Sequence, residues 1–134
     1  MQFQVRGIIA TGVKALDNAI SDLELIANGA SARIYALSGP NGGLVSLAMS
    51  ETGKATVLDQ EFFNPAWAPG ISGDLALIDT GSGLRAVIGA TGPTALGSYS
   101  LPQNGSIGSF AAHTGITASA GRIAAMIETP QGLI

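Results

Sequence analysis

A long stretch of this chain occurs twice, and the repeat limits the possible folds more than any other feature of the sequence. Residues 20–60 reappear 52 positions later as residues 72–112, and residues 22–58 align with 74–110 without a gap. A repeat of this length is typical of supersecondary units that stack or surround an axis, because one unit cannot bury both its faces alone. Nine aligned positions are identical: Asp22 and Asp74, Leu23 and Leu75, Leu25 and Leu77, Ile26 and Ile78, Gly29 and Gly81, Arg33 and Arg85, Leu44 and Leu96, Ser46 and Ser98, and Gly53 and Gly105.

Within each unit, the residue types favour short strands. The chain is 46% hydrophobic but only 5% aromatic and 11% charged, and 19 glycines interrupt the apolar runs. Each glycine costs a helix interior about 1 kcal/mol, so helices are disfavoured. Turn residues divide the first unit into four apolar segments, and Asn104-Gly105 is a strong hairpin signal in the second. The strands predicted in the first unit are 22–26, 32–37, 44–49 and 55–58.

The two ends of the chain resemble parts of the same unit. Phe3–Ile9 and Val13–Asp17 are predicted as strands around a turn at 10–12, as in the second half of the repeat. Near the other end, Arg122–Ile127 resembles a first strand and Pro130–Gly132 the turn that follows it. The expected organisation is a half unit at 1–19, whole units at 20–71 and 72–115, and a half unit at 116–134.

Four antiparallel strands in each repeat are typical of a β-propeller blade. A β-sandwich also contains short strands at this spacing, but it does not account for the internal repeat. We therefore expect an all-β, β-propeller-like fold with little or no helix. Propellers close with at least about four blades, so we expect an incomplete propeller. The remaining blades would come from a longer gene product or from a second chain.

The repeat also resembles a known family. The runs ISDLELI and ARIYALSGPNGGLVSLAMSETGKATVLDQEFF, followed by ISGDLALI and ATGPTALGSYSLPQNGSIG, resemble the N-terminal propeller-like region of hemolysin-type (RTX) calcium-binding proteins of alphaproteobacteria. The resemblance implies a large protein that is exported through a C-terminal signal and binds calcium in glycine- and aspartate-rich nonapeptides. Those nonapeptides do not occur in this sequence, and Asp22 and Asp74 lie in apolar segments. We therefore expect no cofactor in this segment.

Charge and residue content narrow the possible partners and locations. The net charge is −3, and the six Lys and Arg residues are scattered, so we expect no nucleic-acid partner. No apolar run reaches the ~18 residues of a membrane span. The N-terminus lacks the features of a signal peptide. The resemblance implies an extracellular location reached without such a peptide, and a cytoplasmic location is the alternative.

The richest candidate for binding is the aromatic stretch 60–71, which would connect two blades across one face of the disc. Glu61, Phe62, Phe63 and Trp67 lie in this stretch. Aromatic side chains at such a place can stack on a sugar or on a protein partner. The alternative is that Phe62 and Phe63 fill the gap between neighbouring blades.

Three polar side chains are weaker candidates. Arg33 and Arg85 occupy equivalent positions and could hold a carboxylate or a sugar in a central channel. The alternative is that their apolar stems cover a neighbouring blade. His113, the only histidine, is predicted in a loop after the fourth strand, without a nucleophile motif around it. Asp22 and Asp74 are expected to cap turns through side-chain to backbone bonds.

Two functions fit these features. The first is a non-catalytic propeller module of a larger secreted RTX-like protein, which binds a partner protein, a glycan or a neighbouring domain. The alternative is a lactonase-like propeller hydrolase, suggested by the segment Gly97–Ser100. Such an enzyme needs acids, a histidine or an arginine clustered at the mouth of the channel, and this chain has one His. The non-catalytic module is therefore favoured.

Overall fold

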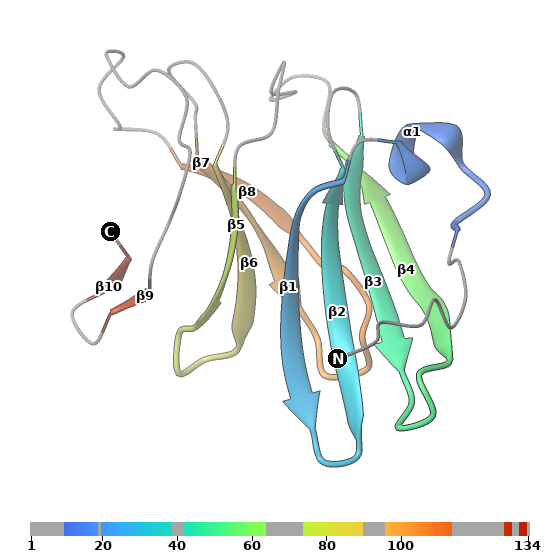
Figure 1. The fold of residues 1–134 in the computed structure, drawn as a ribbon. Helices are drawn as coiled ribbons and strands as arrows, with labels where there is room; N and C mark the ends of the chain where they lie inside the picture. The colour runs from blue at the N-terminus through green and yellow to red at the C-terminus, as the bar shows by residue number, and fades with distance from the viewer. Residues whose placement is uncertain are drawn as a thin grey trace.

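Two four-stranded antiparallel sheets dominate the computed structural model, which describes residues 10–18, 20–38, 42–63, 74–89, 96–113, 128–129 and 132–133 (Figure 1). Sheet 1 has the strand order β1 (Ile20–Asn28), β2 (Ser31–Ser38), β3 (Gly43–Met49) and β4 (Ala55–Phe62). Sheet 2 has the order β5 (Asp74–Asp79), β6 (Leu84–Gly89), β7 (Leu96–Leu101) and β8 (Phe110–His113). The other elements are helix α1 (Lys14–Asp17) and the strand pair β9 (Glu128–Thr129) and β10 (Gly132–Leu133).

The all-β class and the four antiparallel strands in each unit are confirmed. The four segments predicted in the first unit lie within β1 to β4. Strand β4 is longer than expected, because Glu61 and Phe62 still pair with Leu44 and Gly43. The predicted end of this strand at residue 58 is therefore wrong, since β4 continues to Phe62. No helix in the described part of the chain is long and apolar enough to cross a membrane.

The two sheets share one pairing register over most of their length. Pairs of β1 with β2 and of β2 with β3 recur 52 positions later in β5, β6 and β7, and the pairs of Leu44, Val45 and Ser46 with β4 recur in β7 and β8. Examples are Leu23–Ala36 with Leu75–Ile88, Tyr35–Ser46 with Val87–Ser98, and Leu44–Glu61 with Leu96–His113. The register then differs, because a bulge in β4 pairs Leu47 with Val57, whereas Tyr99 pairs with Phe110.

Two glycines make the equivalent hairpin turns possible. Gly53 and Gly105 have φ angles of 80° and 90°, in the left-handed region where a side chain costs backbone strain. Each lies in the turn between the third and fourth strands of its sheet. The sequence repeat is thus also a repeat of backbone conformation at these two positions.

Lys14–Asp17 forms helix α1, and Val13 precedes it in an extended conformation, so the strand predicted at Val13–Asp17 is wrong. The Asp17 carboxylate accepts hydrogen bonds from the Thr11 and Gly12 amides at 2.7 and 3.0 Å, which bends the chain back on itself. Leu16, only 1% exposed, packs against Val45 and Leu47 on sheet 1. These hydrogen bonds and the burial of Leu16 outweigh the strand pattern. The strand predicted at 3–9 lies outside the described residues.

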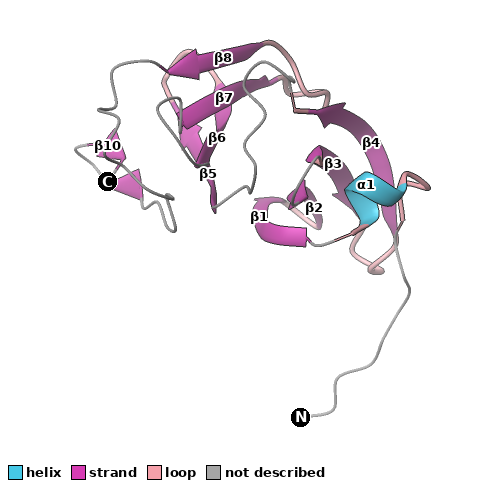
Figure 2. Cartoon of the chain, turned by 90° about the horizontal axis from the view of Figure 1, so that it is seen from above, coloured by secondary structure: helices cyan, strands magenta, loops and turns pink. Residues whose placement is uncertain are grey.

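The main hydrophobic core lies between the sheets, and β1 and β5 run side by side (Figure 2). Burying a leucine or tyrosine side chain of this kind contributes about 1.5–3 kcal/mol, so this interface is the main source of stability. The core residues are Tyr35, Leu37, Leu44 and Phe63 at the sheet 1 side, and Leu75, Ala86, Ile88, Tyr99, Leu101 and Ile107 at the sheet 2 side.

The two sheets meet through opposite faces. Side chains alternate between the faces of a strand, and Tyr35 of sheet 1 points into the core. Its counterpart in sheet 2, Val87, neighbours the core residues Ala86 and Ile88, so it lies on the opposite face. Conversely, Leu75 is 1% exposed in the core, whereas its counterpart Leu23 is 58% exposed. We call the two faces that point away from the core the outer face of sheet 1 and the outer face of sheet 2.

Candidate functional site

Three polar side chains of sheet 1 reach across the core and bind the backbone of the sheet 2 unit. Asp22 Oδ2 accepts a hydrogen bond from the Leu75 amide at 2.8 Å, and Asp59 Oδ2 accepts one from the Ile107 amide at 2.7 Å. The Arg33 guanidinium donates to the carbonyl of Gln103 at 2.7 Å. Bonds to ionised groups are about twice as strong as neutral ones. Asp22 therefore joins the two sheets, and its predicted role in capping a turn is wrong.

On the outer face of sheet 2, Arg85, Ser98 and His113 form a hydrogen-bonded cluster. Arg85 donates to Ser98 Oγ through Nε at 3.1 Å and through Nη2 at 2.8 Å. Ser98 Oγ also lies 2.9 Å from His113 Nε2. The register explains the cluster, because Ser98 pairs with Val87 and Ala111, two residues along the same face from Arg85 and His113.

A guanidinium can only donate, so the Ser98 oxygen accepts from Arg85 through both nitrogens. Between Ser98 Oγ and His113 Nε2 either atom can be the donor, because the roles depend on the tautomer of the imidazole.

The equivalent residues of sheet 1 do not form such a cluster. Ser46 is the counterpart of Ser98, and its hydroxyl is buried without a hydrogen-bond partner in the described part of the structure. Arg33, the counterpart of Arg85, bonds to Gln103 instead. The two arginines thus occupy equivalent positions but make different contacts. Arg85 bonds to a serine of its own sheet, and Arg33 bonds to the neighbouring unit.

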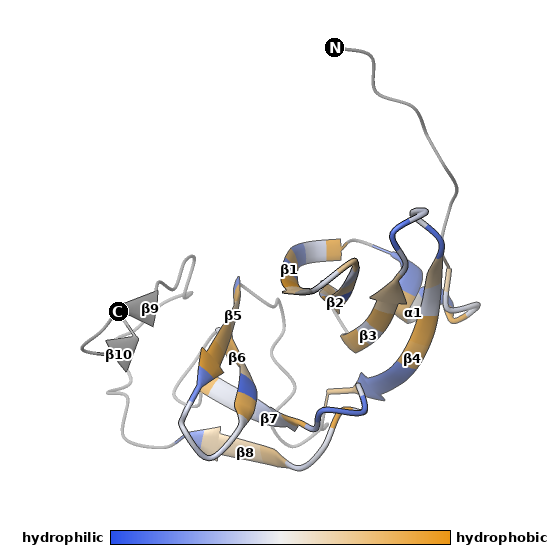
Figure 3. Cartoon of the chain, turned by 90° about the horizontal axis from the view of Figure 1, so that it is seen from below, coloured by the Kyte–Doolittle hydropathy of each residue, from blue (hydrophilic) through white to orange (hydrophobic). Residues whose placement is uncertain are grey.

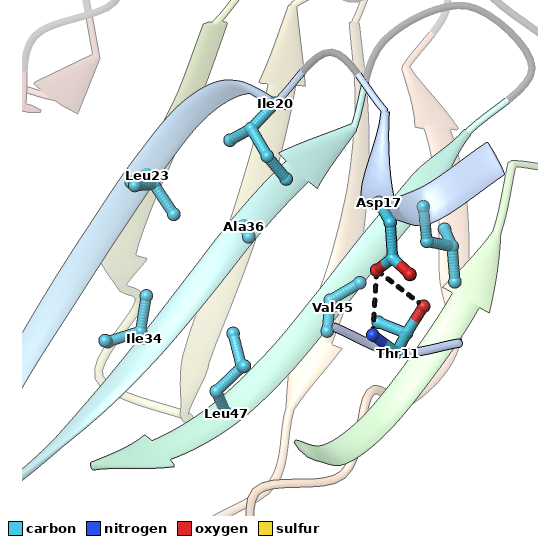
Figure 4. Close-up of a pocket in the computed structure, with 9 residues that line it drawn as sticks. Thr11, Asp17, Ile20, Leu23, Ile34, Ala36, Val45 and Leu47 are labelled. Carbon is cyan, nitrogen blue, oxygen red and sulfur yellow. Dashed lines mark hydrogen bonds between the residues drawn. The ribbon is translucent and has the colours of Figure 1, made fainter. Parts of the chain in front are cut away.

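A second candidate site is an apolar pocket of about 230 Å³ on the outer face of sheet 1 (Figure 4). Side chains from β1, β2 and β3 point into it, and α1 covers one end, where Asp17 is bonded to Thr11. These bonds lower the pKa of Asp17, with the Thr11 amide as the largest cause. The lining residues are Thr11, Leu16, Asp17, Ile20, Leu23, Ile34, Ala36, Val45 and Leu47.

The pocket continues onto an uncovered apolar edge. Ile20, Leu23 and Leu25 of β1 are 46, 58 and 53% exposed. Figure 3 shows that β4, in the same sheet, is apolar over much of its length and hydrophilic at its end. Exposed apolar side chains that adjoin a pocket are typical of an interaction surface.

The aromatic stretch divides between the core and the surface. Phe63 is 7% exposed and packs in the core between the sheets, as the gap-filling alternative predicted. Phe62 is 48% exposed, and Glu61 is also exposed. Burial, and to a smaller extent the negative charge of Glu61, raises the pKa of Tyr99 to about 12. Trp67 lies outside the described residues.

The structure brings together two of the predicted site residues, Arg85 and His113, but it separates them from Arg33, Glu61 and Phe62. His113 lies in β8, so its placement in a loop is wrong. Sequence reasoning missed Ser98, although its identity with Ser46 in the repeat was a usable signal.

Among the described residues, no group of three or more His, Cys, Asp or Glu side chains is placed to hold a metal ion. Comparison of the chain with protein-family models, with curated proteins and with solved structures finds no match.

Proposed function

We propose that the chain is a non-catalytic interaction module in which sheets 1 and 2 are successive blades of a propeller-like assembly. The observation that carries the proposal is the use of opposite faces in the contact between the sheets. If the two sheets were related by a two-fold axis, as in a symmetric sandwich, the contact would bury equivalent faces of both. Head-to-tail packing instead buries one face of the first sheet against the opposite face of the second. Asp22, Asp59 and Arg33 supply polar bonds in this contact.

The exposed parts of the two outer faces are the proposed binding surfaces. The outer face of sheet 1 presents apolar side chains around the pocket. On the outer face of sheet 2, His113 is exposed and Arg85 is half-buried, whereas Val87 and Ser98 are buried. Partners with a matching sheet face, such as further blades or a neighbouring domain, suit these surfaces better than a glycan does, because a glycan needs many polar contacts. The resemblance to RTX proteins suggests that the module is part of a larger exported protein.

One observation favours a hydrolase as a second candidate. Ser98 Oγ lies 2.9 Å from His113 Nε2, which is the spacing of a nucleophile and its general base. However, Ser98 is fully buried, and Arg85 donates to its oxygen through both Nε and Nη2. A substrate carbonyl could not reach this oxygen without displacement of Arg85.

A hydrolysis assay separates the two functions. The purified chain and the Ser98→Ala variant would be tested with aryl esters and lactones, and wild-type protein would be treated with a fluorophosphonate probe. We expect no turnover above the rate of the variant and no labelling of Ser98. Turnover that is lost in Ser98→Ala, together with labelling at Ser98, would overturn the proposal and establish the hydrolase.

A calcium titration tests the expectation that this segment itself does not bind calcium. A ligand that binds only the folded state raises its stability as the ligand concentration rises. Because the calcium-binding nonapeptides do not occur in this sequence, we expect calcium to leave the midpoint of thermal unfolding unchanged. A midpoint that rises with calcium concentration would contradict this expectation.

A further inference from the structure

The turn between β7 and β8 contains a dipeptide with chemistry of its own. Asn-Gly occurs at 28–29, 41–42 and 104–105, and of the three only the Asn104 side chain lies in the described part of the structure. In such a pair, the backbone nitrogen of the glycine can attack the side-chain amide of the asparagine, because glycine has no side chain to hinder a close approach of the backbone. Asn104 is exposed, so water can reach it.

The hydrogen bonds of Asn104 activate its side-chain amide for such an attack. Oδ1 accepts from the Ser106 amide at 3.0 Å and from the Ser106 hydroxyl at 2.7 Å. When a nucleophile adds to Cγ, negative charge develops on Oδ1, and donors that already point at this oxygen stabilise the charge. The carbon that is attacked is therefore already activated in the folded chain.

The attacking nitrogen, in contrast, is held back. The Gly105 amide donates to the Pro102 carbonyl at 3.0 Å, and Gly105 is buried in a left-handed conformation with a φ angle of 90°. A Cβ atom at this position would overlap the Leu58 side chain and lie 3.3 Å from Arg33 Nε, so the turn packs tightly on sheet 1. Before it can react, the nitrogen must give up its bond to Pro102 and rotate toward Asn104, and these contacts oppose the rotation.

The bonds that hold this turn are part of the contact between the sheets. The Arg33 guanidinium donates to the Gln103 carbonyl at 2.7 Å, and Asp59 Oδ2 accepts from the Ile107 amide at 2.7 Å. A segment of a folded protein opens locally with a free energy that is set by the contacts it loses. Release of residues 102–107 from sheet 1 is therefore the step that frees the Gly105 nitrogen.

We propose that Asn104 is a site of spontaneous deamidation that is controlled by the contact between the sheets. When the turn leaves sheet 1, the Gly105 nitrogen bonds to Cγ of Asn104, the Cγ–Nδ2 bond breaks, and ammonia leaves with the proton of the Gly105 amide. Water then opens the cyclic imide at either of its carbonyl groups, which yields aspartate or isoaspartate at position 104. Water is the only other reactant, and no group is oxidised or reduced.

The isoaspartate product does not fit the original contacts. In isoaspartate the main chain runs through Cβ and Cγ, so the turn is longer by one carbon atom. Gly105 fits closely against Leu58 and Arg33, and a lengthened turn displaces it from both. Aspartate keeps the original main chain and the oxygen that accepts from Ser106. The isoaspartate form therefore has a weaker contact between the sheets than the aspartate form.

Removal of Arg33 tests the control by the sheets. The wild-type chain and the Arg33→Met variant would be incubated at neutral pH, and peptide mapping by mass spectrometry would follow modification at Asn104. Because Arg33→Met removes a hydrogen bond from a charged donor, we expect deamidation at least about tenfold faster than in wild type. Arg85→Met is the matched control, since this equivalent arginine bonds to Ser98 of its own sheet and should leave the rate near the wild-type value.

Two further measurements serve if circular dichroism shows that Arg33→Met does not fold. In urea below the unfolding transition, the rate at Asn104 in the wild-type chain should rise with urea concentration, and it should be highest in the unfolded chain. In Asn104→Gln the side chain is longer by one carbon atom, so the imide forms far more slowly and position 104 should stay unmodified.

Pulse proteolysis in urea tests the effect on the fold. Aged protein would be treated briefly with a protease, and the surviving chains would be mapped. We expect isoaspartate at 104 to disappear from the survivors at a lower urea concentration than aspartate does. Equal survival of the two forms would overturn the effect on the contact.

The rates decide the rest of the proposal. Equal rates at Asn104 in folded and unfolded wild-type chains, or in wild type and folded Arg33→Met, would overturn the control by the sheets. An unfolded chain that stays unmodified at Asn104 would overturn the site itself.

Discussion

Sheets 1 and 2 have the same strand order and, over most of their length, the same register, but they turn opposite faces to the core between them. In sheet 2, Leu75 and Ile88 face the core, whereas in sheet 1 the counterparts of these residues, Leu23 and Ala36, line the open pocket. Leu23 is 58% exposed and Leu75 only 1%, so the burial of an equivalent position depends here on what lies against its sheet. A residue that is identical in both units can therefore be essential in one and nearly neutral in the other.

The polar residues show the same dependence on position. Arg33 and Arg85 are identical and equivalent, yet one crosses to the neighbouring unit and the other stays on its own sheet. Ser46 and Ser98 differ accordingly: among the described residues the Ser46 hydroxyl has no partner, whereas that of Ser98 has two. Four predictions test this comparison, in order of decreasing effect.

Replacement of the repeated leucine should give the largest difference between the sheets. Leu75→Ala removes a fully packed side chain from the core, and such changes cost about 2–5 kcal/mol. Leu23→Ala removes a side chain that is 58% exposed, so we expect a change within about 0.5 kcal/mol. Urea unfolding of both variants measures the difference. Equal losses of stability would show that the two faces are equally buried in solution.

Removal of the Asp22 carboxylate should weaken the contact between the sheets. Asp22→Ala leaves the Leu75 amide without its acceptor, and an unsatisfied buried donor costs about 1–3 kcal/mol. Asp79, whose carboxylate accepts from Gly81 within one exposed turn, provides the control. We expect Asp79→Ala to change the free energy of unfolding by less than half as much. A larger effect at Asp79 would argue against a role of Asp22 in joining the sheets.

Replacement by alanine should change the free energy of unfolding in opposite directions at the two serines. Ser98→Ala removes the shared partner of Arg85 and His113, and we expect a loss of about 0.5–1.5 kcal/mol. Ser46→Ala removes a buried hydroxyl that has no partner in the described part of the structure, so stability should stay the same or rise slightly. Thermal unfolding of the two variants, made in the same background, gives both signs. Destabilisation of the chain by Ser46→Ala would reveal a missed partner.

The smallest effect concerns Glu24, which faces sheet 2, while its counterpart Ala76 carries no charge. Burial, and then the charges of Asp22 and Asp74, raise the pKa of Glu24. The folded chain therefore holds this proton more tightly than the unfolded chain does, so ionisation weakens folding as pH rises above the ordinary glutamate range.

Replacement of Glu24 by Gln tests this sign. At neutral pH, Glu24→Gln should be slightly more stable than wild type, because it removes the disfavoured charge. Near about pH 3, below the ordinary glutamate pKa of about 4.3, the two proteins should unfold at similar urea concentrations. A difference that is the same at both pH values would contradict the assignment to ionisation of Glu24.

Much of the fold was predictable because it depends on local pattern. The alternation of apolar residues and the positions of Gly53 and Gly105 define strands and hairpin turns within each unit. The same reasoning failed at Val13–Asp17, because the bonds from Asp17 to Thr11 and Gly12 do not follow from strand periodicity. It also placed His113 in a loop, since four residues of β8 give a weak signal.

By itself, the sequence determined the strands, the hairpins and their repetition, because backbone pairing and side-chain alternation act over a few residues and recur wherever the pattern recurs. Only the tertiary structure decided which face of each sheet is buried, which arginine crosses to its neighbour, and that Arg85, Ser98 and His113 meet. These features depend on what lies against a sheet. Two units with identical residues at a position have different neighbours, and the free energy of burial and of hydrogen bonding is set by those neighbours.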